Sequence, residues 1–192
     1  MTGITGGELG REAARRLAER CRDIQPGLTG AEFDRIEQSY GFAFADDHRA
    51  FLAAGLPVGG SWPDWRNGDP QVLRDKLTWP VEGVLYDVEH NAYWNNGWGE
   101  RPAQTSVAVG RARKHLATVP TLVPVYSHRY LPAGRDTSGH PVMSMYQTDI
   151  IYYGMNLLDY VYQEFSAGPG IRRSDPRWEP LATVPFWRDL VG

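Results

Sequence analysis

Residues 141–168, PVMSMYQTDIIYYGMNLLDYVYQEFSAG, contain the two sequence periodicities that decide the fold class. Residues 142–147 and 149–153 are short runs rich in β-branched and aromatic side chains, which is typical of strands. Asn156 is then well placed to cap an amphipathic helix, and Gly168 to end it. Four apolar residues share the inward face of this helix: Leu157, Leu158, Val161 and Phe165. The stretch therefore predicts two strands followed by a helix.

The sequence before this stretch is mainly helical in pattern. Another strand is predicted over residues 122–126, with residues 128–131 as its extension. Apolar spacing predicts helices over residues 8–22, 30–40, 46–54, a short segment after Pro70, and 105–117. Helices first and adjacent strands afterwards are the pattern of an α+β fold.

Residue types mark several helix ends. Thr29 and Glu32 form a capping box, and Gly41 suits the left-handed conformation that ends a helix. Asp69 and Pro70 supply a cap and a first-turn proline for the short helix. Three apolar residues of that helix are expected to face inward: Val72, Leu73 and Leu77.

The central segment is ambiguous. Residues 81–91, VEGVLYDVEHN, fit either a strand or a short helix. Residues 93–98 place an Asn-Gly turn between two tryptophans, which predicts a tight reversal of the chain.

Length and composition indicate one globular domain over residues 1–192. The net charge of −3 provides no basic field to hold nucleic acid or an anionic membrane. The single cysteine, Cys21, excludes an internal disulfide. The sequence starts without an apolar leader and has no apolar run near the roughly 18 residues of a membrane span, so we expect a cytoplasmic protein.

Candidate catalytic residues are few. His128, His140 and Asp149 lie near predicted strand ends, and two histidines with a carboxylate can hold a metal ion, but no short ligand spacing joins them. Residues 136–139, Asp-Thr-Ser-Gly, resemble a protease nucleophile loop but follow Gly-Arg instead of an apolar strand, so we interpret them as a turn. Phosphate-binding loops, nucleophile elbows and dinucleotide fingerprints are absent from the sequence. The residues favour a protein without a catalytic centre and imply no cofactor.

Motifs spread along the chain carry a family resemblance. The first group is LTGAE (28–32), IE (36–37), YGF (40–42) and DHRAFL (47–52). The second group is Trp94 with WGERP (98–102), LVPVYSHRY (122–130), PVMSMYQTDIIYYG (141–154) and VPFW (184–187). In this order they resemble the SUKH superfamily, which includes the yeast cell-wall-synthesis regulator and many bacterial immunity proteins. The resemblance covers about residues 28–190, is to a long bacterial subgroup, and departs from the family at AGLPVGG (54–60), where a polar Gly-Gly segment is usual.

The resemblance implies N-terminal helices and a C-terminal helix packed on one side of a mixed, mostly antiparallel sheet. Residues 1–25 would be an N-terminal helical extension. Members of the superfamily are not enzymes and act by binding proteins; many neutralise a cognate toxin, often a nuclease, by occluding it. The implied partner is therefore a toxin domain, with no direct contact to nucleic acid or membrane.

Four residues are candidates for binding such a partner. Trp94 and Trp98 represent the aromatic loop, and Arg129 and Asp149 the strand ends, because aromatic and arginine side chains anchor interfaces of about 800 Å² per partner. The alternative interpretation places the tryptophans in the core and pairs Arg129 with Asp149 as a structural ion pair.

Three other functions stay open at this point. The first is a cytoplasmic regulatory or scaffold protein without a toxin partner. The second is a metal-dependent enzyme that uses His128, His140 and Asp149. The third is a small-ligand or sugar binder, whose pocket would be lined by Trp62, Trp65, Trp94 and Trp98.

Overall fold

The structure is a computed structural model that describes residues 4–171, 174–175, 178–180 and 182–192. Its helices are α1 (Gly6–Ala18), α2 (Gly30–Tyr40), α3 (Asp46–Ala54), α4 (Pro70–His90), α5 (Thr105–Leu116) and α6 (Leu157–Phe165), with the 3-10 helices η1 (Asn96–Trp98) and η2 (Trp187–Leu190). Its strands are β1 (Ile24–Gln25), β2 (Leu56–Pro57), β3 (Leu122–Tyr126), β4 (Arg129–Pro132), β5 (Val142–Tyr146) and β6 (Asp149–Gly154). The α+β fold class predicted from the sequence is confirmed.

The main sheet is an antiparallel meander in the order β3-β4-β5-β6, and β1 pairs with β2 separately. Residues 128–131 do not extend β3, as the sequence suggested. The chain reverses at Ser127, whose φ is 49°, and β4 returns antiparallel to β3. Near the C-terminus, Val191 forms a parallel bridge to Ile150, so the sheet is mostly antiparallel with one parallel contact in the described part of the chain.

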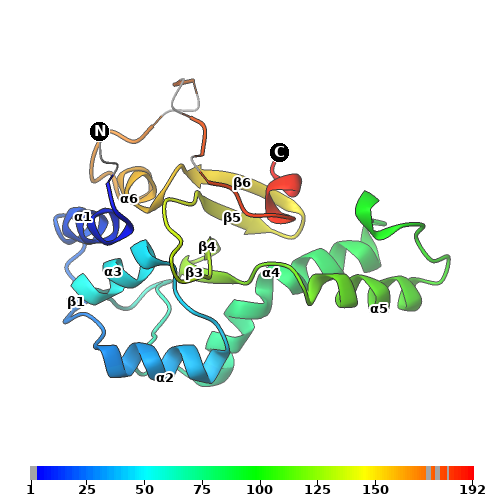
Figure 1. Ribbon diagram of the computed structural model, residues 1–192, viewed down its shortest axis with the longest axis horizontal. Helices are drawn as coiled ribbons and strands as arrows, with labels where there is room; N and C mark the ends of the chain where they lie inside the picture. The colour runs from blue at the N-terminus through cyan, green and yellow to red at the C-terminus, as the bar shows by residue number, and fades with distance from the viewer. Residues whose placement is uncertain (1–3, 172–173, 176–177, 181) are drawn as a thin grey trace.

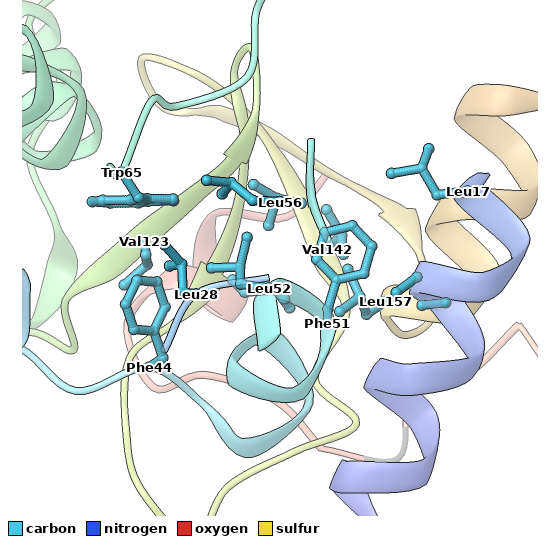
Figure 2. Packing of buried hydrophobic residues seen from close by; sticks show 14 of the residues in the cluster. Leu17, Leu28, Phe44, Phe51, Leu52, Leu56, Trp65, Val123, Val142 and Leu157 are labelled. Atoms are coloured by element: carbon cyan, nitrogen blue, oxygen red, sulfur yellow. The ribbon is translucent and has the colours of Figure 1, made fainter. Parts of the chain in front are cut away.

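One face of this sheet forms the first core with α1, α2, α3 and α6. Side chains alternate between the two faces of a strand, so Val123 and Leu131 share this face with Val142. Figure 2 shows Val142 surrounded by residues of two helices, Phe51 of α3 and Leu157 of α6. The N-terminal helices and the C-terminal helix therefore lie on one side of the sheet, as expected.

The opposite face forms the second core with α4, α5 and the C-terminal segment. Tyr130 and Met143 come from the strands, and Trp187 of η2 is buried beside them. The Trp187 indole donates a 2.7 Å hydrogen bond to the carbonyl oxygen of Pro120. Helix α4 begins beside α2, and its later part lies side by side with α5 and projects away from α1 and α3 (Figure 1). Both faces of the sheet are thus covered.

The N-terminal helix α1 packs against α3 and α6. A Cβ atom on Gly10 would lie 2.0 Å from the carbonyl oxygen of Asp47 in α3, so only glycine permits this approach. The segment expected as an N-terminal extension therefore contributes to the first core. The helix was predicted to reach residue 22 but ends at Ala18, and the chain then turns toward β1.

The sequence signals at the ends of α2 are confirmed. The Thr29 hydroxyl accepts from the backbone N–H of Glu32 at 3.3 Å, and Gly41 has a φ of 70°. At the other end of the chain, α6 stops at Phe165 instead of at Gly168. Ser166 ends the helix because it adopts the left-handed conformation, with a φ of 51°, and beyond it the backbone N–H of Ile171 donates to the Asp159 carboxylate at 2.6 Å.

Candidate functional site

A groove of about 590 Å³ lies between α4 and the turns that connect the strands of the main sheet. We refer to it as the α4 groove. Its apolar lining residues are Val72, Trp79, Tyr130, Met145 and Tyr146, and its polar ones are Ser61, Asp75, Lys76, Ser127 and His128. Although half of these residues are polar, the surface that they present to the groove is mainly apolar, which is typical of binding sites.

Helix α4 forms one wall of the groove and runs without interruption from Pro70 to His90. Asp69 caps it as predicted, accepting from the backbone N–H of Gln71 at 2.7 Å. The prediction of a short helix here is wrong, because residues 81–91 continue the same helix through Pro80 instead of forming a separate element.

Three apolar residues of α4 point outward at intervals of seven. Val72, Trp79 and Tyr86 are 53%, 53% and 47% exposed, and residues seven apart return to nearly the same side of a helix. These three residues are the apolar stripe. The prediction that Val72 faces inward is wrong, because Leu73 and Val84 occupy the buried side of the same helix.

The end of β5 and the turn that joins it to β6 form the facing wall, and Tyr146, the last residue of β5, is 64% exposed. This turn touches α4 closely, since a Cβ atom on Gly83 would lie 3.0 Å from the Cα atom of Gln147. The Asp87 carboxylate accepts from the backbone N–H of Thr148 at 2.9 Å and from its hydroxyl at 2.6 Å. Helix and turn are therefore bonded to each other, which fixes the shape of the groove.

The turn between β3 and β4 contributes His128. Burial lowers the pKa of His128, and the adjacent Arg129 guanidinium, which contacts the His128 Nε2 atom, lowers it further. The imidazole is therefore neutral near pH 7. The charges that line the groove are then those of Asp75 and Lys76, which have opposite sign.

Arg129 and Asp149 do not form the structural ion pair that was the alternative to their role in partner binding. The Arg129 Nε atom lies 3.4 Å from the Glu164 carboxylate, and the guanidinium lies 4.0 Å from the centre of the Tyr153 ring. Arg129 is thus held inside the protein by α6 and β6. Asp149 is exposed and pairs in register with Tyr146 across the turn, next to the α4 groove.

The aromatic loop lies away from the groove, at the second core. Trp98 is only 8% exposed and stacks on His115 and Phe186. Its expected exposure is wrong, and the alternative of core packing is confirmed. Trp94 is half-buried, and its indole donates to the carbonyl oxygen of Gly99 at 2.7 Å.

The structure does not assemble His128, His140 and Asp149 into a metal site. Over the described residues, no group of three or more His, Cys, Asp or Glu side chains is placed to hold a metal ion. His140 is half-buried, and burial lowers its pKa.

The four tryptophans proposed for a sugar pocket also separate. Trp62 and Trp65 belong to the first core, whereas Trp94 and Trp98 belong to the second. The rings therefore do not line one common pocket.

No family model, curated protein or solved structure matches this chain. None of the described helices combines the length and the apolar character that crossing a membrane requires.

The apolar stripe and Tyr146 were not predicted as binding residues, although the seven-residue spacing of the stripe is present in the sequence. That spacing is informative only once residues 70–90 are known to form one helix.

Proposed function

We propose that this protein is a non-enzymatic protein-binding module that docks its partner on the α4 groove and the apolar stripe. The partner is a cognate bacterial toxin domain, which the protein neutralises by occlusion in the cytoplasm as an immunity protein. The SUKH-like segments over residues 28–190 support the toxin partner, and the α+β arrangement agrees with what that resemblance implies.

The observation that carries the binding role is the clustering of exposed apolar side chains. Six large hydrophobic residues are exposed in the described part of the chain. Four of them lie on α4 and the facing wall: Val72, Trp79, Tyr86 and Tyr146. Contiguous exposed apolar patches usually mark interaction sites, and tryptophan and tyrosine are enriched among the residues that dominate binding energy.

The length of the stripe favours a protein over a small ligand. Val72 and Tyr86 are 14 residues apart on one helix, which corresponds to about 21 Å at the usual rise per residue. Tyr86 lies beyond the groove and stacks on His90, with ring centres 4.2 Å apart. A small molecule in the groove would leave Tyr86 uncovered, whereas a protein surface is large enough to cover the α4 groove and the whole apolar stripe.

Alanine substitutions at Trp79 and Tyr146 test the proposal. We expect each to weaken binding to the toxin encoded beside the gene by at least about thirtyfold, because truncating an anchoring aromatic residue costs about 2 kcal/mol or more. Val107→Ala is the matched control, since Val107 is 51% exposed on α5 and lies outside the groove. Binding is measured by calorimetry, and protection by the survival of cells that express toxin and variant together.

Two results would overturn the proposal. A wild-type protein that neither binds the neighbouring toxin nor protects cells removes the immunity function and favours a regulatory or scaffold protein. Equal loss of binding in the Trp79 and Val107 variants removes the α4 groove as the docking surface.

A further inference from the structure

A second cavity, of about 190 Å³, lies between α2, residues 58–69 and the start of α4. Three arginines line it from three different segments: Arg35 from α2, Arg66 from the connecting segment and Arg74 from α4. We refer to it as the arginine cavity. Ser39, one helical turn after Arg35, lines it as well, and no carboxylate does so among the described residues.

Arg66 fixes the wall of this cavity. Its guanidinium lies 2.5 Å from the Glu32 carboxylate and donates to the carbonyl oxygens of Pro26 and Gly27, each at 3.1 Å. The same contact with Arg66 is the main reason that the pKa of Glu32 falls to about 2. The charge of Arg66 is therefore balanced, and its role is to hold residues 58–69 against α2.

The charges of Arg35 and Arg74 are not balanced in this way. Arg35 donates to a neutral group, the backbone carbonyl oxygen of Arg66, at 3.2 Å. Neither Arg35 nor Arg74 forms an ion pair with a carboxylate in the described part of the chain. Two cations that line one cavity repel each other, and an anion bound between them is attracted by both.

We propose that the arginine cavity binds a phosphoryl group, either inorganic phosphate or the phosphate of a small monoester. Arg35 and Arg74 donate to the phosphate oxygens, because the planar guanidinium matches two oxygens of one phosphate at once. The Ser39 hydroxyl supplies a further donor. The volume of the cavity suits a small anion.

This site goes beyond the proposed docking function and does not depend on it. Val72 and Asp75 of α4 face the α4 groove, whereas Leu73 and Arg74 face the arginine cavity. The two sites therefore lie on different sides of the same helix, and a variant in one leaves the residues of the other in place.

Calorimetric titration of the full chain with inorganic phosphate tests the site, at constant ionic strength near neutral pH. We expect saturable binding that Arg35→Gln and Arg74→Gln each weaken by at least about tenfold, because hydrogen bonds to charged groups are the stronger kind. Arg20→Gln is the matched control: it removes one exposed arginine outside the cavity and leaves binding unchanged. Both cavity arginines are exposed, so the melting temperatures of their variants stay close to that of the wild type without phosphate.

Two further ligands complete the experiment. Acetate, a monoanion, is expected to bind more weakly than phosphate, and acetate binding as tightly as phosphate would overturn the assignment of a phosphoryl group. Glycerol 3-phosphate binding at least as tightly as phosphate identifies a monoester as the ligand, and weaker binding identifies the free anion. The proposal would be overturned if titration with phosphate released no more heat than titration with chloride. It would also be overturned if Arg20→Gln weakened phosphate binding as much as Arg74→Gln does.

Discussion

The hydroxyl group of Tyr130 in β4 donates a 2.8 Å hydrogen bond to the backbone carbonyl oxygen of Lys76 in α4. Pro80 lies four residues after Lys76 and has no N–H with which to close this helical turn. A buried carbonyl without a donor is costly, so the tyrosine supplies from the sheet what the proline lacks. Tyr130 is 2% exposed, and burial raises the pKa of its hydroxyl, which stays protonated as a donor. The contact satisfies the carbonyl that Pro80 leaves open in the helix that carries the apolar stripe.

Tyr130→Phe is expected to lower the free energy of unfolding by about 1–3 kcal/mol, because it leaves the Lys76 carbonyl without a partner. In a Pro80→Ala background the same change costs much less, since the alanine N–H can donate to that carbonyl. Urea unfolding of both single variants and the double variant measures the difference. Tyr152→Phe is the control for loss of a tyrosine hydroxyl in the second core. Additive effects of Tyr130→Phe and Pro80→Ala would contradict the proposed link.

Asp87→Ala is expected to release the β5–β6 turn from α4. Asp87 is 4% exposed and bonds both the N–H and the hydroxyl of Thr148, so its loss costs about 1–3 kcal/mol and speeds hydrogen exchange at the Thr148 amide. Asp75→Ala, an exposed change on the same helix, stays within about 0.5 kcal/mol of the wild type. An unchanged exchange rate at Thr148 would show that the turn is held by other contacts.

Gly10→Ala and Gly110→Ala are expected to act in opposite directions. At Gly10 the new methyl group collides with the Asp47 carbonyl and separates α1 from α3, which costs at least about 1–3 kcal/mol. At Gly110 no atom beyond the adjacent backbone of α5 itself lies within 4 Å of the added carbon, so alanine stabilises α5 by about 0.5–1 kcal/mol. Thermal and urea denaturation measure both. Equal effects of the two substitutions would exclude the close α1–α3 contact.

His48 makes the stability of the protein depend on pH. It is 1% exposed, and burial lowers its pKa to about 3, against about 6.5 in an unfolded chain. Between these two pH values the His48 imidazole is protonated in the unfolded chain but stays neutral in the folded chain. The contribution of His48 is therefore complete above about pH 6.5 and falls with acidification, by up to about 1.4 kcal/mol per pH unit.

The neighbouring Asp47 acts in the opposite sense. Burial raises its pKa, so its contribution is present below about pH 3.8 and is lost as the pH rises through the raised value. Comparing His48→Gln with the wild type cancels this term, and the unfolding free energy of the wild type should fall relative to that of the variant as the pH is lowered from about 6 to 4, by up to about 1.4 kcal/mol per pH unit. His90→Gln, an exposed change, should follow the wild-type curve. Parallel curves for His48→Gln and the wild type would disprove the role of His48.

Most elements were predictable from the sequence because their signals act over a few residues. The Thr29–Glu32 box and the left-handed Gly41 bound α2 where the sequence placed them. The β-branched and aromatic runs over residues 142–147 and 149–153 likewise predicted strands, which the structure places at β5 and β6. Caps, turns and strand periodicity depend on atoms close together in the chain, so local sequence contains the information.

The candidate site depends instead on contacts between distant residues. In the local sequence Pro80 indicates a helix end, but α4 continues through it, and Tyr130, 50 positions later, supplies a donor to Lys76. Because the helix is continuous, Val72, Trp79 and Tyr86 share one face. Trp98 likewise leaves the surface because Phe186 and His115 stack on it. The sequence alone therefore determined the α+β class and most of the elements. Tertiary packing decided which aromatic residues are buried and which form the binding surface, because exposure depends on neighbours from elsewhere in the chain.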